Sequence, residues 1–168
     1  MPTTTTATDS LTTSFRDAMA HVCSPVAVIT AFDGDRPHRT TVSAFMSLSM
    51  TPPMATIALD QHSELLGVIR RHGSFAINVL GSHQSDVALT FATKGHNKFD
   101  GVGWTTTETL PALDGAAIFM SCAAERLVPG GDHTIIVGAV QRVVREESAP
   151  LTYHGRGFGT HSPLADVI

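Results

Sequence analysis

The stretch that decides the fold is residues 41 to 53, which read T-V-S-A-F-M-S-L-S-M-T-P-P. Apolar side chains alternate there with small hydroxyl side chains, a period of two that predicts a β-strand, and Pro52-Pro53 ends its pairing. The polar face consists of Thr41, Ser43, Ser47 and Ser49, none of which is charged. Such a face lets a flat polar ring or a phosphate approach the backbone closely. The alternative is a Ser/Thr-rich strand that simply faces water.

The composition indicates one soluble globular domain. The chain has 168 residues and 42% apolar residues, enough for a real core. A net charge of -4 argues against a nucleic-acid-binding surface, and no apolar run approaches the roughly 20 residues of a membrane span. The Thr-rich residues 1 to 8 do not resemble a secretory signal. We expect a disordered tail over 1–10, a domain over 11–160 and a C-terminal tail over 161–168.

The two cysteines point to a reducing compartment. Cys23 and Cys122 lie far apart and outside any C-x-x-C spacing. We interpret both as buried thiols, and we therefore expect a cytoplasmic location.

Periodicity along the chain predicts about seven strands and three helices. The helices are expected to begin near Asp9-Ser10, at Ser63 and at Ser82, and Gly73 is expected to end the second. The strands are expected over 26–30, from the Asp33-Gly34 turn through the 41–50 stretch, and over 54–59, 75–80, 104–108, 117–128, 134–144 and 151–153.

Most of these strands follow one another without an intervening helix. That order excludes a βαβ parallel sheet and predicts a mainly β protein, an antiparallel barrel with a few helices inserted at its edge. Residues 134–140 are apolar on both faces, with Ile135 and Val137 on one and Ile136 and Val140 on the other. A barrel core covers one face only, and the other needs a helix or a partner subunit, so we expect a homodimer.

Several catalytic signatures are missing from the sequence. There is no G-x-S-x-G elbow and no phosphate-binding P-loop, and the nine histidines never show metal-binding spacing, so we predict no metal site. The G-R-G-F-G run at 155–159 has the wrong spacing for a dinucleotide fingerprint, and we interpret it as a flexible C-terminal turn. If the protein is an enzyme, a cofactor supplies the chemistry.

Six motifs resemble, in order, those of the short-chain flavin reductases, the reductase components of two-component flavin-dependent monooxygenases. They are the 41–53 stretch, F-A-I-N-V-L at 75–80, Gln84 with Phe91-Ala92, Lys98-Phe99, Gly131-Asp132-His133, and P-L-T-Y at 150–153. The resemblance covers roughly residues 12 to 159. Ala44 departs from it where a second Ser is common, and Arg39 stands where Gly is common.

The resemblance implies a split β-barrel of Greek-key type working as a homodimer. It also implies that NADH or NADPH reduces FMN or FAD, and that the reduced flavin passes to a separate flavin-dependent monooxygenase. A non-enzymatic flavin- or haem-binding barrel, acting as a sensor or carrier, is the alternative, since fold alone does not fix function.

Candidate site residues follow from the residues and from the resemblance together. Small hydroxyls and backbone N–H groups of residues 41–45 suit the polar edge of a flavin ring, and the start of the helix at Ser63 suits phosphate. Asn78 is expected either to bond near the flavin or to satisfy a neighbouring strand, and Tyr153 either to stack near the nicotinamide or to pack in the core. His133 is predicted to contact the nicotinamide. The predicted cofactor-binding set is Thr41, Val42, Ser43, Ala44, Phe45, Ser47, Leu59, Asp60, Ser63, Asn78, Gln84, Lys98, Phe99 and Tyr153.

Overall fold

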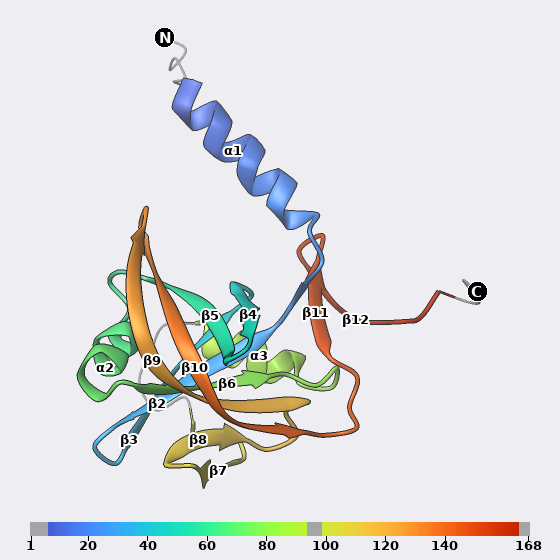
Figure 1. The fold of residues 1–168 in the computed structure, drawn as a ribbon. Helices are drawn as coiled ribbons and strands as arrows, with labels where there is room; N and C mark the ends of the chain where they lie inside the picture. Colours follow the sequence, from blue (N-terminus) through green and yellow to red (C-terminus); the bar gives the residue numbers. More distant parts are fainter. Residues whose placement is uncertain (1–6, 94–98, 165–168) are drawn as a thin grey trace.

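The computed structural model describes residues 7–93 and 99–164, which contain three helices and twelve strands (Figure 1). The helices are α1 (Ala7–Ala20), α2 (Glu64–His72) and α3 (Ser85–Ala92). The strands are β1 (Ser24–Pro25), β2 (Ala27–Asp33), β3 (Arg36–Val42), β4 (Phe45–Met50), β5 (Pro53–Asp60), β6 (Ser74–Val79), β7 (Trp104–Thr107), β8 (Leu110–Leu113), β9 (Ile118–Gly130), β10 (His133–Arg145), β11 (Leu151–His154) and β12 (Gly157–Thr160). No helix in these ranges is long and apolar enough to cross a membrane.

A seven-stranded antiparallel sheet forms the body, in the order β3-β2-β6-β9-β10-β5-β4. Consecutive strands β3 and β4 therefore form its two opposite edges, joined only by Ser43 and Ala44. The predicted single strand through residues 41–50 is wrong in this respect: the chain leaves β2 after Val42, and the Ala44 carbonyl accepts a hydrogen bond from Ala58 N (3.0 Å) on β5. Within the described residues the two edges do not pair, so the barrel is split, as predicted.

The core lies inside this curved sheet. Alternating side chains from its central strands, among them Ile29, Ile57, Ile77 and Ile136, are buried there. The helix α2 contributes Leu65, Leu66, Val68 and Ile69 from one face and ends, as predicted, at Gly73 in the left-handed region (φ 70°). These contacts fix the position of the start of α2 against the end of β5.

The hairpin β7–β8 covers part of the outer side of the sheet. Thr30 Oγ1 donates to the Pro111 carbonyl (2.6 Å), and Asn78 Oδ1 accepts from Leu113 N (2.9 Å). The strand β8 was not predicted from the sequence, since it is short and contains a proline. It anchors the hairpin through buried polar groups of β2 and β6.

The chain ends form a smaller unit beside the body. The strands β1, β11 and β12 make a three-stranded sheet, and α1 projects away from the body (Figure 1). Gly155 N donates to the Ala20 carbonyl (2.7 Å), and Arg156 pairs with Asp17 (2.6 Å), so the β11–β12 turn fastens the end of α1. The predicted flexible turn over 155–159 is wrong beyond residue 156, because residues 157–160 pair with β11.

Two further expectations are corrected here. The helix α1 begins at Ala7, ahead of the expected cap at Asp9-Ser10 and inside the predicted tail. Cys122 is buried, and burial raises the pKa of its thiol to about 12, but Cys23 is exposed, because it follows the projecting helix and has little structure around it.

Candidate functional site

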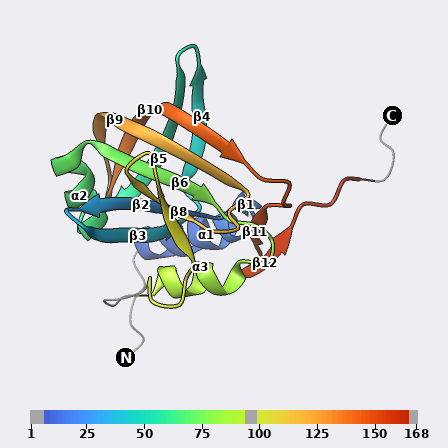
Figure 2. The same cartoon turned by 90° about the horizontal axis from the view of Figure 1, so that it is seen from below.

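A groove of about 780 Å³ lies where β3, the start of α2 and the end of α3 come together. Its wall residues are His38, Arg39 and Thr40 of β3, Asp60, His62, Ser63, Glu64 and Leu65 at the β5–α2 connection, and Phe91, Ala92 and Thr93 at the end of α3. In the view from below, α3 runs alongside β3 (Figure 2). A cavity of this size is in the range of small-molecule and cofactor sites.

The β5–α2 connection supplies groups suited to an anion. His62 N donates to Asp60 Oδ1 (2.7 Å), and this hydrogen bond is the main reason that the pKa of Asp60 is lowered. Ser63 precedes α2 as its N-cap, but its side chain makes no capping hydrogen bond. The Ser63 hydroxyl and the first backbone N–H groups of α2 therefore remain available to the groove.

The Gly131-Asp132-His133 turn packs beside this connection. Gln61 N donates to the Asp132 carbonyl (3.0 Å), Gln61 Nε2 donates to the Gly131 carbonyl (2.6 Å), and His133 is the direct strand partner of Asp60. His133 Nδ1 lies 2.7 Å from Asp132 Oδ1, a hydrogen bond that lowers the pKa of Asp132. The structure thus brings His133 to the groove residue Asp60, although residues 60 and 133 are far apart in sequence.

The β3 wall combines a cation with an aromatic ring. The Arg39 guanidinium carbon lies 5.5 Å from the centroid of the Phe91 ring, and burial is the main reason that the pKa of neighbouring His38 is lowered. Thr41 Oγ1 donates to the Ala88 carbonyl (2.9 Å) and ties β3 to α3. Since that hydroxyl proton is committed, Thr41 offers a ligand its backbone more readily than its side chain.

The rest of the 41–47 segment divides between surface and core. Ser43, Ala44 and Ser47 are exposed, whereas Val42 and Phe45 pack against the core cluster. Leu59 is buried beneath the groove end of β5. The groove wall takes residues 38–40 from this part of the chain, and none of the predicted residues of 41–47 lines it.

Other predicted residues lie away from the groove walls. Asn78 is fully buried and donates to the Val28 carbonyl (3.2 Å) and to Thr30 Oγ1 (3.1 Å), so it satisfies neighbouring strands, the second of its two expected roles. Gln84 is buried and bridges Gly81 N and the Asp114 carbonyl (both 2.9 Å). Both amides thus hold the fold together.

Two aromatic residues of the predicted set have different surroundings. Phe99 packs against the groove residue Phe91, with ring centroids 5.1 Å apart and the rings tilted by 52°, and so supports the α3 wall. Tyr153 belongs to the small sheet and contacts Phe158 (5.4 Å). Lys98 lies outside the described residues.

Sequence reasoning did not select His38, Arg39, Thr40, His62 or Glu64 as site residues. The spacing of the histidines indicates no metal site, and Arg39 stands out in the sequence only as a departure from the family pattern. The available signal was position: residues 38–40 immediately precede the hydroxyl-rich stretch, and residues 62 and 64 flank the predicted Ser63. Within the described residues no group of three or more His, Cys, Asp or Glu is placed to hold a metal ion.

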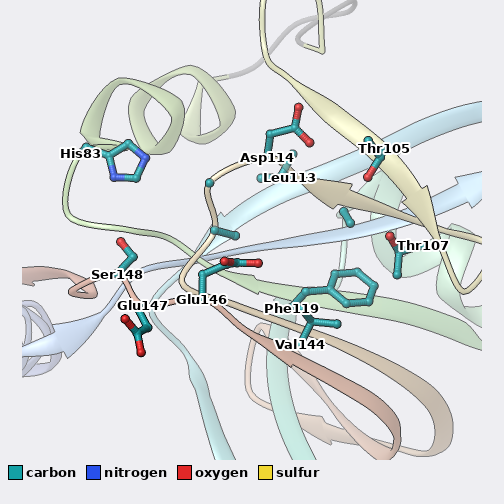
Figure 3. A pocket seen from close by; sticks show the side chains of 13 residues that line it. His83, Thr105, Thr107, Leu113, Asp114, Phe119, Val144, Glu146, Glu147 and Ser148 are labelled. Carbon is teal, nitrogen blue, oxygen red and sulfur yellow. The ribbon is translucent and has the colours of Figure 1, made fainter.

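A second cavity, of about 580 Å³, lies under the β7–β8 hairpin (Figure 3). It is lined by three carboxylates, Asp114, Glu146 and Glu147, together with His83, Thr105, Thr107 and the Phe119 ring. None of the predicted site residues lines it. Its carboxylates disfavour an anionic nucleotide, so we take the first cavity as the candidate site and call it the groove; the second is the acidic cavity.

The fold is a split β-barrel with a groove at one side. The chain belongs to the flavin reductase family: the Flavin reductase like domain matches residues 19–162. It is 40% identical over 146 residues to the actinorhodin polyketide dimerase of Streptomyces coelicolor, covering 85% of this chain and 82% of that protein. It is 35% identical over 154 residues to the reductase component of a 4-nitrophenol monooxygenase from Rhodococcus opacus, covering 92% and 83%.

Solved structures agree with this assignment. The NADH:FAD oxidoreductase SgcE6 of Streptomyces globisporus, in complex with NAD and FAD fragments, superposes with a TM-score of 0.88 at 28% identity, covering 98% of this chain and all of that one. The flavin reductase PheA2 superposes with a TM-score of 0.84 at 27% identity, covering 90% and 98%.

Proposed function

We propose that this protein is an NADH-dependent flavin reductase that supplies reduced flavin to a partner flavin-dependent monooxygenase. Its relatives include NADH:FMN oxidoreductases and the reductase components of monooxygenases. The observation that supports the proposal best is that two predicted residues, Asp60 and Ser63, line one groove and that the predicted His133 is the strand partner of Asp60.

The residues of the groove fit a flavin. The Ser63 hydroxyl and the first-turn N–H groups of α2 supply donors for a phosphate. The exposed backbone at Ser43 and Ala44 supplies hydrogen-bonding groups for the polar edge of the ring. A bound flavin contributes the ability to accept a hydride from NADH; the chain contributes binding, orientation and exclusion of water.

His133 is proposed to position the nicotinamide. A carboxylate only accepts hydrogen bonds, so the 2.7 Å contact with Asp132 requires the proton of His133 to lie on Nδ1. In the neutral ring, Nε2 is then a hydrogen-bond acceptor, suited to the amide N–H of a nicotinamide carboxamide. The His133 side chain is 44% exposed and can be reached from solvent.

The proposed assembly is a homodimer. On β10, Ile136 is fully buried whereas its neighbour Ile135 is 39% exposed, beside exposed Leu127 and Val128 of β9. The projecting α1 exposes Leu11, Phe15 and Met19, and Val22 just after it is exposed as well. Apolar surface on this scale is unusual for a monomer, and a second copy would cover it. We also propose a cytoplasmic location, on the basis of the two free cysteines.

The test is a steady-state assay with purified protein, in which NADH absorbance is followed with FMN and with FAD. We expect NADH to be oxidised only when flavin is added. Flavin or haem binding without NADH oxidation would instead favour the non-enzymatic carrier. Light scattering at micromolar protein checks the dimer, and a stable monomer would contradict it.

A further inference from the structure

Arg39 is the feature of the groove that the proposed function leaves without a role. It lies on β3, where it is half-buried, and its guanidinium is held over the Phe91 ring at 5.5 Å. Among the described residues that line the groove it is the only Arg or Lys. A guanidinium held against an aromatic ring loses little further freedom when it binds an anion.

Position along β3 separates Arg39 from the proposed ring site. Side chains two residues apart on a strand share a face, so Arg39 and Thr41 both face α3, and Thr41 is bonded to Ala88 there. Arg39 is one step further from the Ser43-Ala44 backbone. It therefore serves a part of the ligand beyond the flavin ring.

The groove then has two places for an anion. One is the Ser63 hydroxyl with the first turn of α2; the other is the Arg39 guanidinium on the β3 wall. A flavin mononucleotide has a single phosphate and needs only one of them. A dinucleotide flavin has a second phosphate, for which Arg39 supplies a cation; the buried Phe91 ring that holds Arg39 is itself supported by Phe99 at 5.1 Å.

The acidic residues of the groove make the cation necessary for a second phosphate. Glu64, in the first turn of α2, interacts electrostatically with Arg39, and Asp60 lies on the same connection. Without Arg39 these two carboxylates would face the ADP half of the ligand with no Arg or Lys among the described lining residues.

We propose that Arg39 is a specificity-determining residue that favours FAD over FMN, its guanidinium binding the ADP half of the dinucleotide beside Phe91. This inference rests on the proposed function, because it takes the groove as the flavin site. It concerns which flavin is bound, not whether flavin is reduced.

The experiment measures the dissociation constants of FAD and FMN by calorimetry for the wild type, Arg39→Ala and Arg39→Lys. Arg142→Ala is the matched control, since Arg142 pairs with Glu108 on the β7–β8 side and its loss changes the net charge equally. We expect Arg39→Ala to weaken FAD binding roughly tenfold and FMN binding less than about twofold. Arg39→Lys should lie between, and Arg142→Ala should match the wild type. ADP alone should compete with FAD in the wild type and not in Arg39→Ala.

Equal losses for both flavins would overturn the inference, because Arg39 would then serve the phosphate that they share. Unchanged FAD binding would overturn it as well, as would an effect confined to the Michaelis constant for NADH or NADPH. Failure of the proposed function has a different signature: the wild-type protein would oxidise NADH with neither flavin. The two failures are therefore distinguishable in one set of proteins.

Discussion

The groove and the acidic cavity are two hollows beside the same sheet, and they differ in charge more than in size. The groove combines Arg39 with the start of α2, whereas the acidic cavity presents Asp114, Glu146 and Glu147 (Figure 3). A nucleotide is an anion, so the groove suits it and the acidic cavity repels it. Volume alone would not separate the two; the presence of an arginine in the groove does.

Their walls are also built differently. The groove lies where separate elements meet, at the ends of β5 and α3 and the start of α2, so backbone groups there are left for a ligand. The acidic cavity lies under a hairpin fixed from beneath by Thr30 and Asn78, whose hydrogen bonds are made within the fold. Thr30 and Asn78 therefore support the fold, whereas the groove residues have groups left to bind a ligand.

The largest expected effect is on stability, from Asn78→Ala. The change removes the acceptor of Leu113 N and leaves space in a fully buried site. We expect the free energy of unfolding to fall by about 2–4 kcal/mol in urea denaturation. The flavin affinity of the folded protein should not change.

Ser121→Ala is the matched control for this variant. Ser121 is buried on the same sheet, but its hydroxyl has no partner among the described residues. Its loss should cost less than about 0.5 kcal/mol. A specific loss of flavin affinity in folded Asn78→Ala would instead place Asn78 in the flavin site.

The next effect is on catalysis, from His133→Ala. Loss of one hydrogen bond to the nicotinamide costs about 0.5–1.5 kcal/mol, which corresponds to roughly a several-fold to tenfold fall in kcat/KM for NADH. Flavin affinity should hold. His83→Ala, in the acidic cavity, is the control and should behave as wild type. If flavin binding falls and the NADH parameters hold, His133 belongs to the flavin site.

A smaller effect is expected from Ser47→Leu, read out as flavin binding. Ser47 is exposed on β4, so a larger side chain there should hinder the approach of the ligand while leaving the fold intact. We expect roughly threefold weaker flavin binding and an unchanged melting temperature. Thr105→Leu makes a similar change beside the acidic cavity. Equal flavin affinity in wild type and Ser47→Leu would count against a role for the β4 face.

The smallest effect is expected from the acidic cavity itself. In the double variant Glu146→Gln and Glu147→Gln, kcat/KM for NADH and the affinity for both flavins should stay within about twofold of wild type, since charges exposed to water are well screened. The same steady-state assay checks this. A tenfold change in either quantity would mean that the acidic cavity takes part in the reaction.

Periodicity was sufficient to predict most strands and the class of fold. The apolar 75–80 and 134–144 runs became central strands, because buried strands require side chains that are apolar on the inner face. Periodicity failed where a segment becomes a strand through its partner and not through its own residue pattern. Residues 157–160 are glycine-rich and exposed, yet they pair with β11. The turn between β9 and β10 falls at Gly131 (φ 63°), so β9 extends through Pro129.

Site residues could be predicted where a short sequence motif by itself determines the local backbone structure. Ser63 was expected to begin a helix and does so. Arg39 and His38 were not selected, because their place in a groove depends on α3 reaching across to β3, a contact absent from local sequence. Asn78 shows the reverse: a polar residue in an apolar strand attracted a functional interpretation, whereas β8, which uses its amide, had not been predicted.

The position of β3 and β4 at opposite edges of the sheet has a consequence for chain entropy. Because only Ser43 and Ala44 separate them, the two edges stay near one another even in the unfolded chain. Lengthening this link would cost little, about 0.6 kcal/mol for each doubling of a flexible loop. The slower event is the pairing of β5 with β10, which brings Asp60 to His133 and joins distant segments. The pairing that brings His133 to Asp60 is thus among those that the folding chain must search longest to find.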